Sequence, residues 1–104
     1  MTSIFKALSD PTRRQVLQML RTGPMTAGAL ADAFDVSKPT MSAHFAVLVA
    51  ADLIEADKSG RTITYRLKMS VLEEALMDFA QAFGLKVAPE APATNIDNQK
   101  KEKS

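Results

Sequence analysis

The chain of 104 residues contains no cysteine, no tryptophan and only one histidine, His44. Without a thiol it has no disulfide, no thiolate metal ligand and no cysteine nucleophile, which fits a reducing compartment. A lone histidine with no matched carboxylate one helical turn away is a poor metal ligand, and no nucleophile is suitably placed beside it. The four glycines form no phosphate-binding loop. We therefore expect no catalytic site, metal site or cofactor, and we expect His44 to be partly buried and bonded to backbone groups.

Long apolar runs are also missing, since no stretch approaches the roughly 20 residues that cross a bilayer. The N-terminus has neither the basic start nor the apolar segment of a signal peptide. With 46% hydrophobic and 24% charged residues, the composition is that of an ordinary globular protein. These features predict a soluble cytoplasmic protein that does not insert into a membrane. A domain this small buries a modest share of its surface, which favours pairing with a second copy.

The chain has no strong excess of charge of one sign, because its formal net charge is +1. Positive charge is nevertheless concentrated between residues 58 and 68, a segment without an acidic residue. Such a strip can bind phosphates, but it can equally be the solvated surface of a hairpin, and composition leaves both interpretations open. The strip consists of Lys58, Arg61, Arg66 and Lys68.

Large apolar residues are scarce at the C-terminal end of the chain. Beyond Lys86 come two prolines, several alanines and a polar run over residues 95–104 that carries three lysines. Residues of this kind bury too little apolar surface to offset the entropy lost on ordering. We therefore expect one compact domain over residues 1–86 and a disordered C-terminal tail over residues 87–104.

Helix-capping signals divide the first half of the chain. Asp10, followed by proline, predicts the start of a helix that ends at the next Gly-Pro pair. Thr26 predicts the start of a short helix. Ser37 predicts the start of a longer one, which continues to about Ala51. With a short helix at the N-terminus, this makes four predicted helices before any strand.

Beyond Leu53 the apolar period changes from helical to alternating. The alternation on both sides of Ser59-Gly60 predicts a β-hairpin with one buried face, which includes Ala56. Ser70 and Glu73 have the spacing of a capping box that opens a last helix. The predicted order is α-α-α-α-β-β-α, so the fold class is mainly α with a small β-hairpin (α+β). A hairpin directly after a helix-turn-helix is a wing, which makes the predicted architecture a winged helix-turn-helix.

The helix after Ser37 is the second helix of this predicted motif, and its N-terminal half should enter the major groove of DNA. Met41, Phe45 and Leu48 share one face and should pack inward. Hydroxyl, amino and methyl groups on the other face can contact phosphates and base edges, although capping alone also accounts for two of the hydroxyls. The candidate DNA-binding residues of this helix are Ser37, Lys38, Pro39, Thr40, Ser42 and Ala43.

The second half of the same helix, Ala46–Ala51, carries no charge that could bind phosphate. We therefore expect the wing to supply much of the electrostatic attraction to DNA. Lys58 and Arg61 flank the predicted tip, where an arginine can enter a narrow minor groove. Arg66 lies on the outward face, and an exposed arginine without a DNA contact is an equally good interpretation for it. The candidate DNA-binding residues of the wing are Lys58, Arg61 and Arg66.

The first and last helices carry more apolar residues than one small three-helix core can cover. Stripes at helical spacing are usually core, but two of them at opposite ends of the chain favour a contact that extends to a second copy. A two-fold dimer also sets two reading helices about one turn of DNA apart. The candidate dimer residues are Ile4, Phe5, Leu8, Leu72, Leu76, Phe79 and Phe83.

Several segments resemble the ArsR family of winged-helix repressors, in the order in which that family has them. FKALSDPTRRQVL over residues 5–17 resembles the family's opening, and SKPTMSAHF over residues 37–45 resembles its recognition helix. Gly60-Arg61 and the sequence YRL at residues 65–67 resemble its wing. The resemblance covers about residues 2–83. Within the family, Met25–Gly28 and Ser37–Pro39 are most similar to the SdpR-type autorepressors.

The resemblance implies a sequence-specific repressor, often of its own promoter, that binds an inverted-repeat operator as a homodimer joined through its first and last helices. Many relatives release DNA when a metal binds a cysteine pair in the first helix of the motif, but Ala27–Ala31 contains no thiol here. Others use aspartate and histidine on the last helix, which has no histidine in this chain. We therefore expect a repressor that does not respond to metals. Asp52 departs from the family, whose members commonly have glycine there.

Two other classes of function remain open. A winged helix that binds only proteins is favoured by the uncharged segment Ala46–Ala51, and an enzyme has little support because nothing in the sequence supplies a reactive group. As partners we expect double-stranded DNA and a second copy of the chain. We also consider a protein that sequesters the repressor.

Overall fold

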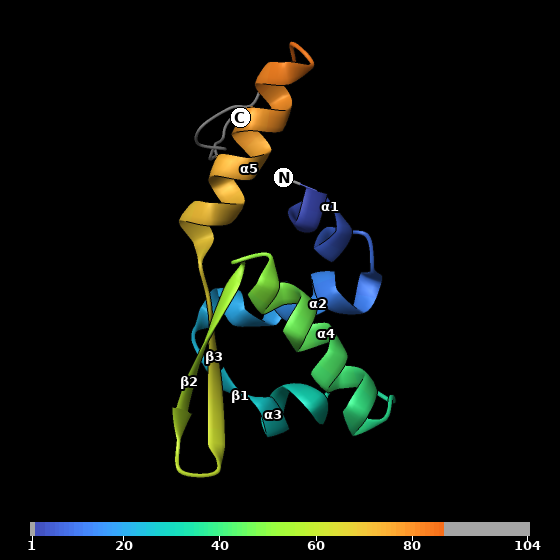
Figure 1. Cartoon of the computed structure of the whole chain (residues 1–104), viewed down its shortest axis with the longest axis vertical. Helices are drawn as coiled ribbons and strands as arrows, with labels where there is room; N and C mark the ends of the chain where they lie inside the picture. Colours follow the sequence, from blue (N-terminus) through green and yellow to red (C-terminus); the bar gives the residue numbers. More distant parts are fainter. Residues whose placement is uncertain (1, 87–104) are drawn as a thin grey trace, which may run out of the picture.

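The computed structural model describes residues 2–86, and Figure 1 shows their arrangement. Met1 and residues 87–104 lie outside the described residues, so disorder of the tail stays a prediction. Within residues 2–86, no helix combines the length and the apolar character that crossing a bilayer requires. The elements in chain order are α1 (Thr2–Leu8), α2 (Pro11–Met19), the 3-10 helix η1 (Leu20–Thr22), β1 (Met25–Thr26), α3 (Ala27–Ala31), α4 (Lys38–Ala50), β2 (Ile54–Ser59), β3 (Thr62–Leu67) and α5 (Met69–Ala82).

This order confirms the predicted fold class, with one short strand added. The three strands form an antiparallel sheet in the order β1-β3-β2, in which Met25 of β1 is opposite Tyr65 of β3. The sequence prediction omitted β1 because a strand of two residues has no alternation to detect. The fold is therefore mainly α with a small sheet, in the order expected of a winged helix-turn-helix.

Three predicted helix starts are confirmed by hydrogen bonds of their capping side chains. The Asp10 carboxylate accepts a hydrogen bond from the backbone amide of Arg13 at 3.1 Å. The hydroxyl of Thr26 accepts one from the amide three residues later at 3.1 Å, and that of Ser37 does so at 3.3 Å. Each cap satisfies a backbone N–H that has no partner within its own helix. These contacts fix where α2, α3 and α4 begin.

The predicted capping box of the last helix is wrong. α5 begins at Met69, and the residue before it, Lys68, makes no side-chain hydrogen bond to the helix. The backbone amide of Lys68 instead donates to the carbonyl of Leu53 at 2.8 Å. Because β3 leads into α5 within a single residue, the helix has already begun at Ser70, which was the expected cap.

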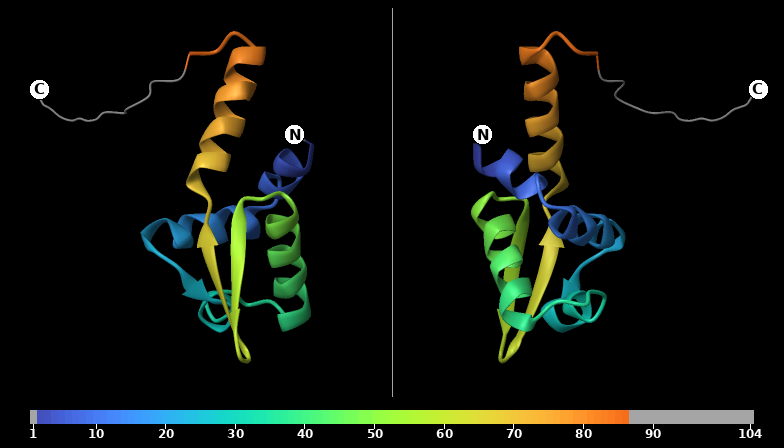
Figure 2. Two further views of the ribbon diagram at one scale, coloured as in Figure 1. Left: turned by 60° about the vertical axis from the view of Figure 1, so that its left-hand side comes forward. Right: turned by 90° about the vertical axis from the view of Figure 1, so that its right-hand side faces the viewer.

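The wing is the hairpin of β2 and β3, and its turn lies one residue later than predicted. β2 still includes Ser59, and the turn begins at Gly60, whose φ of 61° favours glycine. Ile54 and Tyr65 are buried, as a one-sided hairpin requires. The expectation for Ala56 is wrong, because β2 is exposed beyond its first residue. β2 is an edge strand of the sheet and pairs with β3 alone, and in Figure 2 the tip of the hairpin projects past the end of α4.

α4 is held in the core by the three residues predicted to face inward, Met41, Phe45 and Leu48, which are all buried. The ring of Phe45 packs against that of Tyr65 on β3, with the ring centroids 4.7 Å apart. This contact sets α4 against the wing. It also leaves the opposite face of α4 towards solvent.

The two ends of the molecule carry different elements. In Figures 1 and 2 the N-terminal end of α4 lies at the same end as the tip of the wing, and we call this the α4–wing end. The helices α1 and α5 lie at the opposite end in every view, and we call this the α1–α5 end.

Candidate nucleic-acid interface

The first turns of α4 present small polar side chains to solvent. All six residues that were predicted to contact DNA from this helix are exposed. The Ser37 hydroxyl donates a hydrogen bond to the hydroxyl of Thr40 at 2.9 Å, besides its capping contact. Capping therefore accounts for the Ser37 hydroxyl, as the alternative interpretation held, whereas the Thr40 hydroxyl contacts the capping side chain and not a backbone amide. Ser42 and Ala43, on the next turn, are exposed as well.

Two open hollows lie beside the start of α3. One, about 350 Å³ in volume, lies between α3 and the wing, where Arg61 lines it. The other, about 170 Å³, lies between α3 and α4, where Lys38 and Ser42 line it. Ala27 and Gly28 line both hollows, and no acidic residue lines either of them. The start of α3 thus joins the exposed face of α4 to the wing without placing negative charge between them.

The positive charge of the wing is partly offset by its other strand. Lys58 and Arg61 are exposed near the tip, as predicted. Arg66 is also exposed, but its Nε lies 3.9 Å from a carboxylate oxygen of Glu55, which faces it across the hairpin. An exposed pair contributes little to stability, yet it lowers the charge that Arg66 offers to a phosphate. The strip over residues 58–68 contains no acidic residue itself, but the folded hairpin places Glu55 of β2 beside it.

Lys68, the last residue of the predicted basic strip, binds a carboxylate of the same chain. Its Nζ donates to Asp52 at 2.7 Å, and this hydrogen bond raises the pKa of Lys68 above its usual 10.5. Asp52 has a φ of 63°, which is the left-handed region that glycine adopts most easily and aspartate tolerates. A positive φ at this position is compatible with glycine as well as with aspartate. The pair ties the end of α4 to the start of α5.

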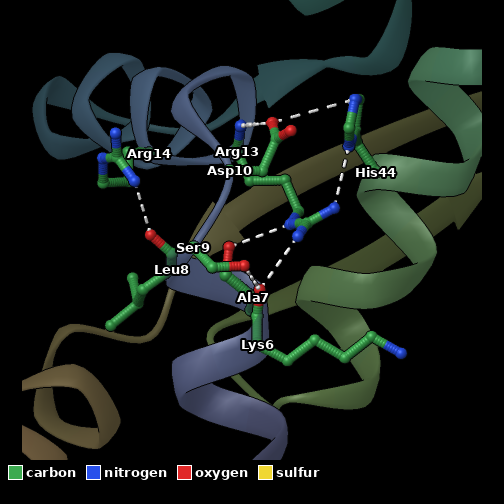
Figure 3. Close-up of polar contacts among 8 residues, drawn as sticks. All are labelled: Lys6, Ala7, Leu8, Ser9, Asp10, Arg13, Arg14 and His44. Carbon is green, nitrogen blue, oxygen red and sulfur yellow. Dashed lines mark hydrogen bonds and ion pairs between the residues drawn. The ribbon is translucent and has the colours of Figure 1, made fainter.

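The ring of His44 contacts side chains, so the prediction that it bonds backbone groups is wrong. In Figure 3 dashed lines join its two ring nitrogens to Asp10 and Arg13. Nη1 of Arg13 lies 3.1 Å from Nδ1 of the ring, and Oδ2 of Asp10 lies 3.9 Å from Nε2. The pKa of Asp10 lies below its usual 3.8, mainly because the carboxylate accepts the backbone N–H of Arg13. Sequence reasoning missed this cluster because His44 lies 31 residues from Arg13 in the chain.

The α1–α5 end exposes apolar side chains of α5. Leu76, Phe79 and Phe83 are 46%, 40% and 68% exposed. Phe79 also packs against Phe5 of α1, with ring centroids 5.2 Å apart, and against Phe83 at 4.8 Å. The four other predicted dimer residues are half-buried, namely Ile4, Phe5, Leu8 and Leu72. Sequence analysis missed three further exposed apolar residues at this end, Met69, Met77 and Leu85.

Known proteins similar to this chain show to which family it belongs. A family model described as a helix-turn-helix domain matches residues 8–56. The transcriptional repressor SdpR of Bacillus subtilis is 43% identical over 76 residues, which are 73% of this chain and 84% of that protein. A crystal structure of an ArsR family transcriptional regulator has a TM-score of 0.69 and 32% identity, and the match covers 83% of this chain and 92% of that one. The chain belongs to the ArsR family of winged helix-turn-helix repressors.

Other relatives of this ArsR chain agree. The arsenical resistance operon repressor of Staphylococcus xylosus is 36% identical over 73 residues, which are 70% of each protein. The structure of an ArsR-like transcriptional regulator from Rhodococcus sp. RHA1 has a TM-score of 0.68 and 34% identity, covering 80% of this chain and 77% of that one. In an ArsR protein with this fold, α3 and α4 are the helix-turn-helix and the hairpin of β2 and β3 is the wing.

Proposed function

We propose that this chain is a DNA-binding transcriptional repressor that acts as a homodimer on an inverted-repeat operator and needs no metal effector. The observation that carries the proposal is the division of the surface between two ends. The α4–wing end exposes hydroxyl groups together with Lys38, Lys58 and Arg61, whereas the α1–α5 end exposes leucine and phenylalanine side chains. The first chemistry suits nucleic acid, and the second suits another apolar surface.

α4 acts as the reading helix in this proposal. Its exposed face enters the major groove, with Ser42 and Ala43 next to base edges. Lys38 approaches a phosphate or a guanine. Ser37, Pro39 and Thr40 lie at the start of the helix, where hydroxyls and backbone amides meet phosphates. The uncharged residues Ala46–Ala51 lie at the other end of the helix, away from this contact.

The wing holds the DNA backbone beside the reading helix. Lys58 and Arg61 extend from the exposed tip and bind phosphates or enter the minor groove. Arg66 contributes less, because Glu55 neutralises part of its charge. The hollow between Arg61 and the start of α3 leaves room for the backbone between the two contacts.

A second copy covers the apolar surface of α1 and α5. Burial of the exposed parts of Leu76, Phe79 and Phe83 removes apolar area from water in both protomers, which favours association. Two-fold symmetry then places two reading helices about 34–36 Å apart, one turn of DNA, and this spacing requires an inverted repeat. The resemblance to SdpR-type autorepressors favours an operator in the promoter of the chain's own gene.

Regulation by a thiol-bound metal does not suit this sequence, since it contains no cysteine and one histidine. Within residues 2–86, no group of three or more histidine, cysteine, aspartate or glutamate side chains is placed to hold a metal ion. We therefore expect that low-micromolar zinc, cadmium or arsenite leaves the repressor on its DNA in a mobility-shift assay. Release that a chelator reverses would contradict the metal-independent proposal.

A mobility shift on the promoter of its own gene, repeated at two salt concentrations, tests the proposal as a whole. Binding should weaken steeply as salt rises, because phosphate contacts release counterions. The uncharged segment Ala46–Ala51 favours a second candidate, a winged helix that binds only proteins. That candidate predicts either no mobility shift or a non-specific one. A non-specific shift disappears when random competitor DNA is added, whichever promoter fragment is used as the probe.

A further inference from the structure

Arg13 lies where three helices meet, at the end of α1, the start of α2 and the middle of α4 (Figure 3). Its Nε donates to the carbonyl of Ala7 at 2.9 Å, and its Nη2 donates to the carbonyl of Lys6 at 2.9 Å. Its third contact is the one to His44 of α4, at 3.1 Å. A single guanidinium therefore joins α1, near the α1–α5 end, to the helix that reads DNA.

The chemistry of the two groups makes this link directional. The last carbonyls of a helix have no partner within it, and the planar guanidinium presents its donors in a fixed fork. A guanidinium has no acceptor, so Nδ1 of His44 must accept, which leaves the ring proton on Nε2. That nitrogen faces Asp10, whose carboxylate is held at the start of α2 by the backbone amide of Arg13. The ring thus has one acceptor and one donor, each facing a complementary group.

We infer that Arg13 and His44 are positioning residues, which fix the angle between the reading helix and the dimer helices. This inference rests on the proposed function. The core holds α4 through Met41, Phe45 and Leu48, and apolar contacts of this kind are not directional. A dimer sets the distance between two copies of α4 only as firmly as each α4 is fixed to its own α1. The hydrogen bond from Arg13 to His44 supplies the fixed orientation that the apolar contacts lack.

The predicted consequence is strict discrimination of half-site spacing. One base pair inserted at the operator centre rotates one half-site by about 35° and moves it by about 3.4 Å relative to the other. A rigid wild-type dimer should lose at least about tenfold in affinity for the altered operator. A protein whose reading helices swing relative to α1 should tolerate the insertion better, although it binds the natural spacing less tightly. Replacing a group that only fills space in the core would not change the ratio of the affinities for the natural and the altered operator.

Substitutions at His44 separate the hydrogen bond from the packing. Asparagine places an amide oxygen near the position of Nδ1 and can accept from Arg13, whereas leucine has a similar size and cannot. We expect His44→Asn to keep the tenfold penalty for the inserted base pair and His44→Leu to reduce it to about threefold or less. The dimer association constant, from sedimentation equilibrium without DNA, should change less than about twofold in both variants.

Variants of two neighbouring arginines give a second, independent comparison. Arg13→Lys keeps the charge, but one ammonium group cannot join α1 and α4 as the fork does, so the spacing penalty should fall as it does in His44→Leu. Arg14→Lys is the matched control. Arg14 donates to the carbonyl of Leu8 at 2.7 Å, so this hydrogen bond joins α2 to α1 and does not involve α4. Arg14→Lys should therefore retain the wild-type penalty.

Two results would overturn the inference. The first is that Arg13→Lys still loses tenfold in affinity when the base pair is inserted, and that His44→Leu does the same if it folds. The second is an equal loss of discrimination in His44→Asn and His44→Leu. The rate of backbone amide hydrogen exchange over residues 41–48, measured without DNA, tests the hydrogen bond between Arg13 and His44 independently. This rate should increase in His44→Leu but not in His44→Asn. If the wild-type protein bound no operator, the proposed function would be wrong. The link between α1 and α4 would still be tested by amide exchange, which needs no DNA.

Discussion

The α4–wing end and the α1–α5 end share one small core but differ in which side chains they leave exposed. In the first turns of α4 the exposed groups are hydroxyls, a methyl and the amino group of Lys38, and the large apolar residues Met41 and Phe45 are buried beneath them. The loop before the helix also exposes Asp35 and Val36. Along α5 the exposed groups are Leu76, Phe79 and Phe83. The first surface gains little from leaving water, whereas the second gains from every contact with another apolar surface. Under the proposed function, a single chain thus recognises nucleic acid at one end and associates with a second copy at the other.

The difference also concerns the response to salt. Phosphate contacts weaken steeply as the salt concentration rises, because each releases condensed counterions. Burial of apolar surface depends little on moderate salt and is not weakened by it. Dimerisation and DNA binding should therefore be separable by salt and by substitution, and the following predictions use that separation.

The largest effect is expected from Phe79→Asp at the α1–α5 end. The variant would bury an unpaired carboxylate in each protomer, which should weaken dimerisation by at least about a hundredfold. Sedimentation velocity should show a folded monomer or an unfolded chain. Gln81→Asp is the matched control, since it adds the same group at an exposed position of α5 about half a turn away. A folded Phe79→Asp dimer of unchanged affinity would contradict the assignment of this surface.

The next effect is expected from Arg61→Ala at the wing. Affinity should fall by a similar factor on operator and on scrambled DNA, because a phosphate contact carries no sequence information. The slope of log affinity against log salt should become shallower by about one unit for each lost phosphate contact. Lys86→Ala removes the same charge beyond α5 and should change neither quantity. If Arg61→Ala also changes neither, the wing does not bind DNA.

A smaller and more selective effect is expected from Ser42→Ala on α4. Loss of one hydrogen bond to a base edge should cost roughly 1 kcal/mol, about fivefold in affinity, on the operator. Scrambled DNA should be bound almost as tightly as by the wild type, and preference should flatten at one base position. Competition titrations against a panel of single-base operator variants measure this. Equal losses on operator and scrambled DNA would instead assign Ser42 to the phosphate backbone.

The smallest effect concerns Asp10, between the two ends. Its pKa is lowered in the folded chain, so its ionised form stabilises the fold above pH 3.8, and this contribution is lost as pH falls through the lower folded pKa. Asp10→Asn keeps a good helix cap without the charge. The stability of wild type relative to Asp10→Asn, from urea unfolding, should therefore decrease as pH falls from 5 to 2. Parallel pH profiles would mean that the Asp10 charge plays no such role.

What the sequence predicted well was local. The caps of α2, α3 and α4 were predicted because each joins a side chain to an amide three residues away. The inward face of α4 followed from helical periodicity, and the exposed residues followed with it. The sequence therefore sufficed to place the candidate site on α4 and the wing, although its individual DNA contacts remain predictions.

What the sequence did not predict depends on contacts between distant residues. The cap at Ser70 failed because Lys68 is joined to Leu53 and Asp52, which lie far back in the chain. The charge of the wing was overestimated because Glu55 lies on the opposite strand. His44 was assigned to backbone partners because nothing in its neighbourhood reveals Arg13, 31 residues earlier. In each case the pairing is set by how the elements pack, which periodicity and capping rules do not contain.

The stoichiometry of the complex with an operator duplex tests the central claim most directly, namely that one end dimerises while the other reads DNA. Sedimentation equilibrium over a titration should show free duplex and duplex with two chains, and almost no duplex with one chain. The same titration with half of the inverted repeat scrambled should require markedly more protein. A single chain bound per duplex, with an affinity that does not depend on the second half-site, would contradict the account.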